Sequence, residues 1–155
     1  MSDLAIGKNA PDFEIPRDGG GTVSLKALAG KPVVLYFYPK DDTEACTKEA
    51  ISFTGLLPEF EKAGVTVIGV SPDSVKKHDK FATKHNLSIV LGSDEDTALA
   101  NLYGVWKEKS MYGRTYMGVE RTTFLIGADG KIVRIWPKVK VAGHAEEVLE
   151  GVKAL

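Results

Sequence analysis

Runs of apolar, β-branched and aromatic residues recur along the chain and predict the strands of one sheet. The run PVVLYFY, residues 32–38, is almost continuously apolar, which is typical of a central strand covered on both faces. The run VTVIGV, residues 65–70, predicts a second buried strand. Two further strands, residues 121–126 and 132–136, flank the turn ADGK at residues 128–131 and should pair as an antiparallel hairpin.

Segments with helical spacing of apolar residues separate these strands. We predict helices over residues 43–62 with an interruption near Gly55 and Pro58, from residues 71–74 onward, over residues 94–103 and over residues 143–155. Near the N-terminus, PDFEIP and TVSL flank the glycine-rich turn at residues 18–21 and predict a short hairpin. The segment 106–119 is predicted to be a long mobile connection. This order of elements indicates an α/β fold, with helices on both faces of a mixed central sheet.

The composition indicates one small globular domain covering residues 1–155. No internal repeat, low-complexity tract or charge block divides the chain, and its length suffices for a sizeable core. With 20 basic and 21 acidic residues the net charge is −1, so no overall field favours nucleic acid or a membrane as a partner. The N-terminus lacks the pattern of a signal peptide. A single cysteine cannot form an internal disulfide, which predicts a location in the reducing cytoplasm.

The only cysteine, Cys46, lies where an open α/β sheet usually carries reactive groups. It follows the carboxyl end of the strand at residues 32–38 and stands about one turn into a predicted helix. Free N–H groups and the helix dipole at such a place favour a thiolate over a thiol. The polar neighbours of Cys46 argue for a reactive thiol rather than a buried structural cysteine.

Three further residues can be interpreted in more than one way. Thr43 lies one helical turn before the cysteine, so its hydroxyl can cap the helix or turn toward the sulfur or a bound oxygen. Pro39 fixes the exit of the preceding strand and offers an apolar wall beside the site. Arg121 opens a distant strand, and its position alone would indicate a solvated surface group.

The pattern Pro39-x-x-x-Thr43-x-x-Cys46 matches the peroxiredoxin signature. The segments YFYPKDDT and CTKEA resemble the bacterioferritin-comigratory, or peroxiredoxin Q, branch of that family. APDF near the start, VIGVSPDSVKKHDKF in the middle and ERTTFLIGADGKI near the end extend the resemblance over nearly the whole chain. The resemblance implies a thioredoxin-like fold with an N-terminal β-hairpin. It also implies a thiol-dependent peroxidase that needs neither a metal nor an organic cofactor.

The same resemblance implies a role for each residue of the site. Cys46 would be the nucleophile that attacks hydrogen peroxide or an organic hydroperoxide and becomes a sulfenic acid. Thr43 would orient the peroxide, Pro39 would shield the sulfur and Arg121 would complete the site. Glu49, on the same helix as the cysteine, would hold Arg121 by an ion pair.

This chain departs from the branch at two places. Pro-Gly commonly precedes the cysteine, and here those positions are Glu44 and Ala45. The second cysteine of many members, which resolves the sulfenic acid, is replaced by Ile51 or, in the following helix, by Ala82. We therefore predict resolution by an external thiol from thioredoxin, glutaredoxin or glutathione. For the oligomeric state we expect a monomer, with a weak dimer as the alternative.

Two other functions compete with the peroxidase. A thiol–disulfide oxidoreductase on a related fold generally uses Cys-x-x-Cys, but Thr43 and Glu49 occupy the positions three residues to either side of Cys46. A non-catalytic interaction or holdase module would not need the ordered signature. The three histidines show no short metal-ligand spacing, so surface or capping roles are expected for His78, His85 and His144, and no metal site is predicted.

Overall fold

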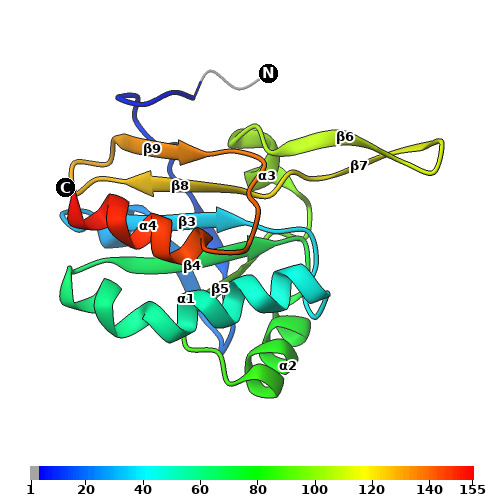
Figure 1. The fold of residues 1–155 in the computed structure, drawn as a ribbon, viewed down its shortest axis with the longest axis horizontal. Coiled ribbons are helices and arrows are strands. Elements are labelled where there is room, and N and C mark those ends of the chain that lie inside the picture. Colours follow the sequence, from blue (N-terminus) through cyan, green and yellow to red (C-terminus); the bar gives the residue numbers. More distant parts are fainter. Residues whose placement is uncertain (1–3) are drawn as a thin grey trace.

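The structure, a computed structural model, describes residues 4–155, so residues 1–3 of the predicted domain lie outside the described residues. Within that part of the chain a five-stranded sheet runs in the order β5-β4-β3-β8-β9 (Figure 1). Its strands are β3 (Val33–Phe37), β4 (Thr66–Ser71), β5 (Val90–Ser93), β8 (Thr122–Ile126) and β9 (Ile132–Trp136). β3 pairs in parallel with β4 and antiparallel with β8, so the sheet is mixed, as predicted. The edge strand β5 was not predicted from the sequence.

Helices cover both faces of this sheet. They are α1 (Glu44–Lys62), α2 (Val75–His85), α3 (Ala98–Leu102) and α4 (His144–Lys153), with the short 3-10 helix η1 (Lys26–Leu28). α1 and α4 pack side by side over one face, where Tyr36 and Phe53 stack with ring centroids 4.8 Å apart. α3 and the N-terminal segment cover the other face, against Leu35 and Phe37. Each face therefore has its own apolar core, which explains why β3 is apolar at every position.

The predicted N-terminal hairpin is present. β1 (Glu14–Pro16) pairs antiparallel with β2 (Thr22–Ser24). The turn between them contains Gly19, Gly20 and Gly21, all with positive φ, a conformation that glycine adopts without steric cost. The hairpin and the preceding residues pack on the α3 side of the sheet through Phe13 and Val23.

The predicted interruption of the long helix is wrong. α1 runs without a break through Gly55 and Pro58. Proline removes one backbone donor and glycine lowers helix propensity. Both positions are exposed, whereas Ala50, Phe53 and Phe60 on the opposite side of the helix are buried in the core. Packing of that apolar face outweighs the weak local propensity.

The predicted helix at residues 94–103 is shorter in the structure, where α3 begins at Ala98. Asp94 lies before the helix, and its carboxylate accepts the N–H groups of Leu99 at 3.0 Å and Ala100 at 2.9 Å. Thr97 adopts φ 60°, so the chain turns into the helix only after this acidic segment. The acidic residues therefore serve the helix start as expected, but from outside the helix.

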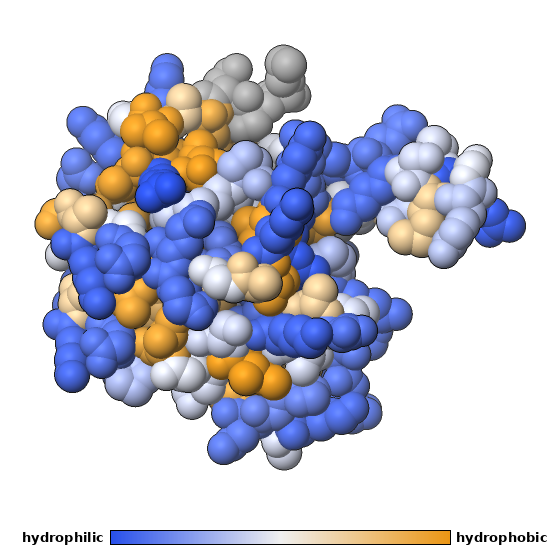
Figure 2. Space-filling model, in the orientation of Figure 1, coloured by the Kyte–Doolittle hydropathy of each residue, from blue (hydrophilic) through white to orange (hydrophobic). Residues whose placement is uncertain are grey.

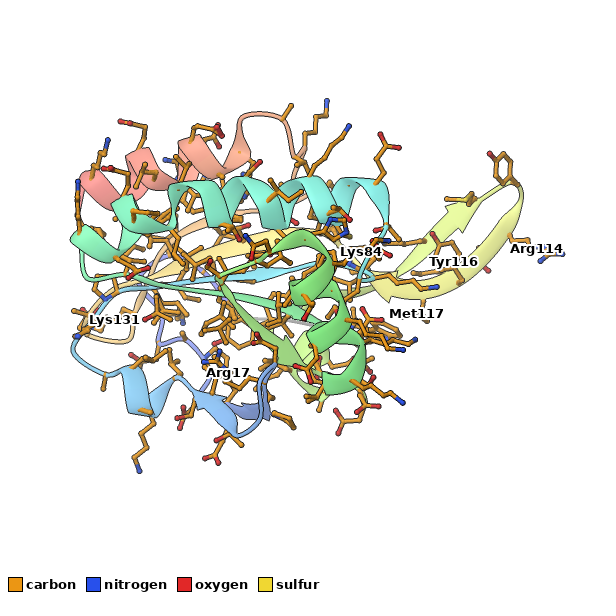
Figure 3. All side chains as sticks on the ribbon, turned by 90° about the horizontal axis from the view of Figure 1, so that it is seen from below. Arg17, Lys84, Arg114, Tyr116, Met117 and Lys131 are labelled. Carbon is orange, nitrogen blue, oxygen red and sulfur yellow. The ribbon has the colours of Figure 1, made fainter. Side chains whose placement is uncertain are left out.

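The segment 106–119 forms a β-hairpin, not the mobile connection that we predicted. β6 (Trp106–Met111) pairs antiparallel with β7 (Arg114–Val119). The two-residue loop Tyr112–Gly113 has positive φ at both residues, as the mirror-image hairpin turns require. This hairpin projects from the body of the molecule (Figures 1 and 2). Arg114, Tyr116 and Met117 lie on it, with Arg114 at its outer end (Figure 3).

Candidate active site

Cys46 lies in the first turn of α1, just after the carboxyl end of the central strand β3. The helix begins at Glu44, and the N–H of Thr47 donates to the carbonyl of Thr43 at 2.9 Å. The N–H groups earlier in this turn have no partner within the helix, so the helix end directs partial positive charge toward the sulfur. Cys46 is only 2% exposed. A nucleophile is thus placed in a sheltered and electropositive position.

Strand pairing brings Arg121 to this cysteine from far along the chain. Arg121 precedes β8, and the register of β8 on β3 places Thr122 opposite Phe37, at the end of β3 where the chain turns into α1. From there Arg121 Nη2 donates a hydrogen bond to Cys46 Sγ over 3.3 Å. The guanidinium is a permanent cation, so it stabilises negative charge on the sulfur.

Glu49 holds the same guanidinium from the other side. It follows Cys46 by one helical turn, and Arg121 Nη1 donates to its Oε1 over 2.6 Å. Glu49 is 1% exposed, and its Oε2 has no hydrogen-bond partner within residues 4–155. Burial raises the pKa of Glu49 to about 7, although Arg121 acts in the opposite direction. Burial also opposes the charge of Arg121, but Glu49 and Cys46 outweigh it and raise the pKa of the guanidinium.

Pro39 and Thr43 lie in the loop between β3 and α1. The Thr43 hydroxyl donates to the carbonyl of Lys40 at 2.9 Å and caps no N–H group of α1 in the described chain. The capping alternative is therefore wrong. Pro39 is half-buried, and Thr43, the last residue of the loop before α1, is exposed. The structure joins Cys46, Glu49 and Arg121 by direct contacts and adds Pro39 and Thr43 as the adjacent loop.

A further basic residue near the site was missed. Lys109 on β6 is half-buried, and burial together with Arg121 lowers its pKa, while Glu120 and Cys46 act in the opposite direction. Its ammonium therefore contributes to the field at the sulfur. From the sequence, the basic residues between Lys107 and Arg114 were interpreted as a solvated loop rather than as a guide for an anionic partner, so Lys109 was not assigned to the site.

The histidines also differ from expectation, since two of them are buried. His144 Nε2 lies 2.8 Å from Thr123 Oγ1, and burial lowers the pKa of His144 to about 4. His78 is fully buried and contacts Asp41. Among residues 4–155, no group of three His, Cys, Asp or Glu side chains could hold a metal ion. The described helices include none with the length and apolarity to cross a membrane.

Comparison with known proteins places these features in a family. The model of the AhpC/TSA family matches residues 6–135. Peroxiredoxin Bcp of Xanthomonas campestris is 49% identical over 156 residues, covering 99% of this chain and 98% of that protein. Peroxiredoxin Bcp of Bacillus subtilis is 47% identical, and the match covers 97% of this chain and 96% of that protein.

Solved structures agree with this assignment. Peroxiredoxin Q of Xanthomonas campestris superposes with a TM-score of 0.90 at 48% identity, covering 98% of this chain and 96% of that chain. A mutant of PrxQ from Xylella fastidiosa superposes with a TM-score of 0.94 at 43% identity, and the match covers 99% of this chain and 98% of that chain. The predicted thioredoxin-like fold is confirmed. The chain therefore belongs to the AhpC/TSA family, among the peroxiredoxins named Bcp and peroxiredoxin Q.

Proposed function

We propose that this peroxiredoxin reduces hydrogen peroxide and organic hydroperoxides at Cys46 and that an external thiol regenerates the enzyme. The contact between Arg121 Nη2 and Cys46 Sγ at 3.3 Å carries this proposal, because it places a fixed cation beside the only sulfur nucleophile. A solved relative at 47% identity, the bacterioferritin comigratory protein of Xanthomonas campestris, is described for its alkyl peroxide reduction activity. That description supports organic hydroperoxides as substrates here.

The reaction begins with attack of the Cys46 thiolate on one peroxide oxygen. An S–O bond forms while the O–O bond breaks, and the electron pair leaves with the second oxygen, which takes a proton to become water or an alcohol. Sulfur loses two electrons and the peroxide gains them. Charge therefore moves from the sulfur to the departing oxygen. Arg121 and the N–H groups of the first turn of α1 stabilise both ends of that movement.

The remaining residues of the site are proposed to orient these groups. Glu49 holds the guanidinium of Arg121 at one position. The Thr43 hydroxyl, whose proton goes to the Lys40 carbonyl, retains lone pairs that can accept a hydrogen bond from the peroxide. Pro39 shields the sulfur from bulk water. These assignments to Thr43 and Pro39 rest on their place in the loop and on the family resemblance.

An external thiol completes the cycle because Cys46 is the only cysteine. Its attack on the sulfenic acid forms a mixed disulfide and water, and a second thiol releases reduced Cys46. Ile51 and Ala82, where many relatives have a second cysteine, offer no sulfur. Glutathione, a thioredoxin or a glutaredoxin is the proposed reductant. The proposal includes a cytoplasmic monomer that binds neither nucleic acid nor membrane.

We expect the purified protein without reductant to consume about one equivalent of peroxide and then stop. The sulfenic acid has no thiol within the chain to react with, so excess peroxide should convert it to the sulfinic acid. Intact-mass spectrometry after a peroxide pulse measures both products. With glutathione present, the mass of a mixed disulfide should appear and the sulfinic acid should decline.

Consumption of many equivalents without reductant, beyond the one for the sulfenic acid and the further one for the sulfinic acid, would contradict the single-turnover prediction. Equal over-oxidation with and without glutathione, and no adduct at any time, would exclude glutathione. The same experiment with a thioredoxin and with a glutaredoxin would then identify the reductant.

Glu49 should give the reaction a dependence on pH. Because its pKa in the folded protein is about 7, Glu49 gains a proton as the pH falls through neutrality, and its ion pair with Arg121 becomes a hydrogen bond from the cation to a neutral carboxyl group. We expect the oxidation rate constant per thiolate to fall about fivefold between about pH 8 and pH 6, since the ion-paired hydrogen bond holds the guanidinium more strongly by about 1 kcal/mol. Stopped-flow kinetics measure the rate, and ultraviolet absorbance measures the thiolate fraction.

Glu49→Gln removes the titrating group and should react at the lower rate across this range. Glu59→Gln, an exposed glutamate of the same helix, is the matched control and should keep the wild-type profile. If Glu49→Gln shows the same fall with pH as wild type, another group is responsible.

A further inference from the structure

A buried ion pair joins the loop before α1 to the neighbouring helix α2. Asp41, in the middle of that loop, lies with its Oδ2 2.6 Å from Nδ1 of His78. The other ring nitrogen, Nε2, lies 2.9 Å from the carbonyl oxygen of Gly92 at the end of the sheet. The His78 side chain is completely buried, and that of Asp41 is 5% exposed. Both contacts are therefore shielded from water.

These contacts favour a positively charged imidazole. A backbone carbonyl only accepts hydrogen bonds, so Nε2 of His78 must carry a proton. The carboxylate of Asp41 accepts the proton on Nδ1, and an imidazole with both nitrogens protonated is a cation. Burial alone would lower the pKa of His78, but the Asp41 carboxylate, the Gly92 carbonyl and the charge of Asp73 raise it.

The polar groups around the pair are also bound. Asp41 Oδ1 accepts the Tyr38 hydroxyl from β3 at 2.6 Å, and the Asp41 N–H donates to Asp73 Oδ2 at 2.8 Å. Asp73, between β4 and α2, accepts the Ser71 hydroxyl at 2.7 Å. Lys77 of α2 lies with its Nζ 4.0 Å from Asp73 Oδ1. Tyr38 and Asp73 are thus the titratable groups bound to the pair, and Lys77 lies beside Asp73. The other charged side chains that line the same cavity as Asp41 and Asp73 are Lys40, Asp42, Lys80 and Lys84.

This network restrains the chain that leads into the active site. The loop, residues 39–43, holds Pro39 and Thr43, and the first turn of α1 with Cys46 follows it directly. We propose that Asp41 and His78 are positioning residues of the peroxidase reaction, whose buried ion pair holds this loop against α2 in the conformation that reacts with peroxide. The inference rests on the proposed function. It adds α2 to the structural elements that position the active site.

The pair predicts an upper pH limit to the reaction. As the pH rises through the raised pKa of His78, the ring loses one proton, and one of its two acceptors loses its donor. The charge of Asp41 then lacks its buried partner, and the loop is released from α2. The rate constant for oxidation of Cys46 should therefore decline as the pH rises through that pKa, and this decline should be absent once the pair is removed.

A second Asp–His pair on the same two elements provides a matched control. Asp42, the next residue of the loop, lies with its Oδ1 2.9 Å from His85 Nε2 and its Oδ2 2.7 Å from Lys84 Nζ. The side chain of Asp42 is 46% exposed and that of His85 is 21% exposed, so water reaches both partners. An exposed pair contributes little to stability, because water and salt screen it. The two pairs share chemistry and location and differ in burial.

The experiment measures oxidation of Cys46 by hydrogen peroxide in Asp41→Asn and His78→Gln, with Asp42→Asn and His85→Gln as controls. Circular dichroism and thermal melting report whether each variant folds. We expect the buried-pair variants to react about 10²-fold more slowly, as for other small displacements of a reacting group. The controls should change by less than about fivefold. A folded Asp41→Asn that reacts at the wild-type rate would overturn the positioning role.

Two measurements on the wild type decide the matter if the variants do not fold. Nitrogen-15 NMR of the imidazoles should show both nitrogens of His78 protonated on the acid side of its raised pKa, and the oxidation rate should decline as the pH rises through that pKa. A His78 ring with a single N–H, or a rate with no such decline, would overturn the inference. A wild-type Cys46 that does not react with peroxide at all would overturn the proposed function itself.

Discussion

Cys46→Ser is expected to reduce peroxide consumption to the background rate. Serine matches the size of cysteine, but its hydroxyl stays protonated near neutral pH and is a far weaker nucleophile. The chain has only this cysteine, so no other thiol can replace it. Peroxide consumption with excess dithiothreitol measures the loss directly.

Ala45→Ser is the matched control for this change. It adds a hydroxyl one residue before Cys46 at an exposed position and should keep the wild-type activity. Thermal melting of Cys46→Ser should match wild type within a few degrees, because the buried volume hardly changes. Residual turnover of the folded Cys46→Ser protein would place the nucleophile elsewhere.

Arg121→Ala should slow oxidation of Cys46 by about 10²–10³-fold, the loss typical of one preorganised charge-stabilising donor. Removing the guanidinium takes away the donor at 3.3 Å from the sulfur and leaves Glu49 buried without its partner. Arg121→Lys keeps the charge but not the two-pronged geometry, so only part of the rate should return. Stopped-flow kinetics at fixed pH compare the three proteins.

A loss of stability could imitate this effect, and a double variant separates the two. Arg121→Ala leaves the buried carboxyl group of Glu49 without its partner, whereas Arg121→Ala combined with Glu49→Gln does not. The double variant should regain melting temperature but not rate. Arg114→Ala removes one positive charge at the exposed outer end of the β6–β7 hairpin and should react normally (Figure 3). Recovery of rate together with stability would refute the electrostatic role of Arg121.

The β3–α1 junction could be predicted from sequence because its signals are local. A continuous apolar run, a proline and a polar turn occur in order, and the cysteine follows within one helical turn. The contact between Arg121 and Cys46 has no local sequence signal. It depends on the register of β8 on β3, which no local pattern specifies, so only the family resemblance indicated it.

The errors arose where tertiary contacts or unusual turns prevail over local preference. Tyr112–Gly113 adopts a hairpin turn that is normally marked by Asn-Gly or Asp-Gly, so residues 106–119 showed no recognisable turn signal. Pro58 remains within α1 because the opposite face of the helix is packed. His78 resembles a surface residue until Asp41 and Gly92 are brought around it. Burial of polar groups is a property of the assembled fold.

The separation of 75 residues between Cys46 and Arg121 has a consequence for synthesis of the protein. A ribosome completes β3 and α1 long before it reaches β8, so the growing chain carries its sulfur without the guanidinium. Closing so long a loop costs conformational entropy, and only the contacts of the completed sheet offset that cost. The nascent thiol therefore lacks its activating cation until β8 has been synthesised and has paired with β3.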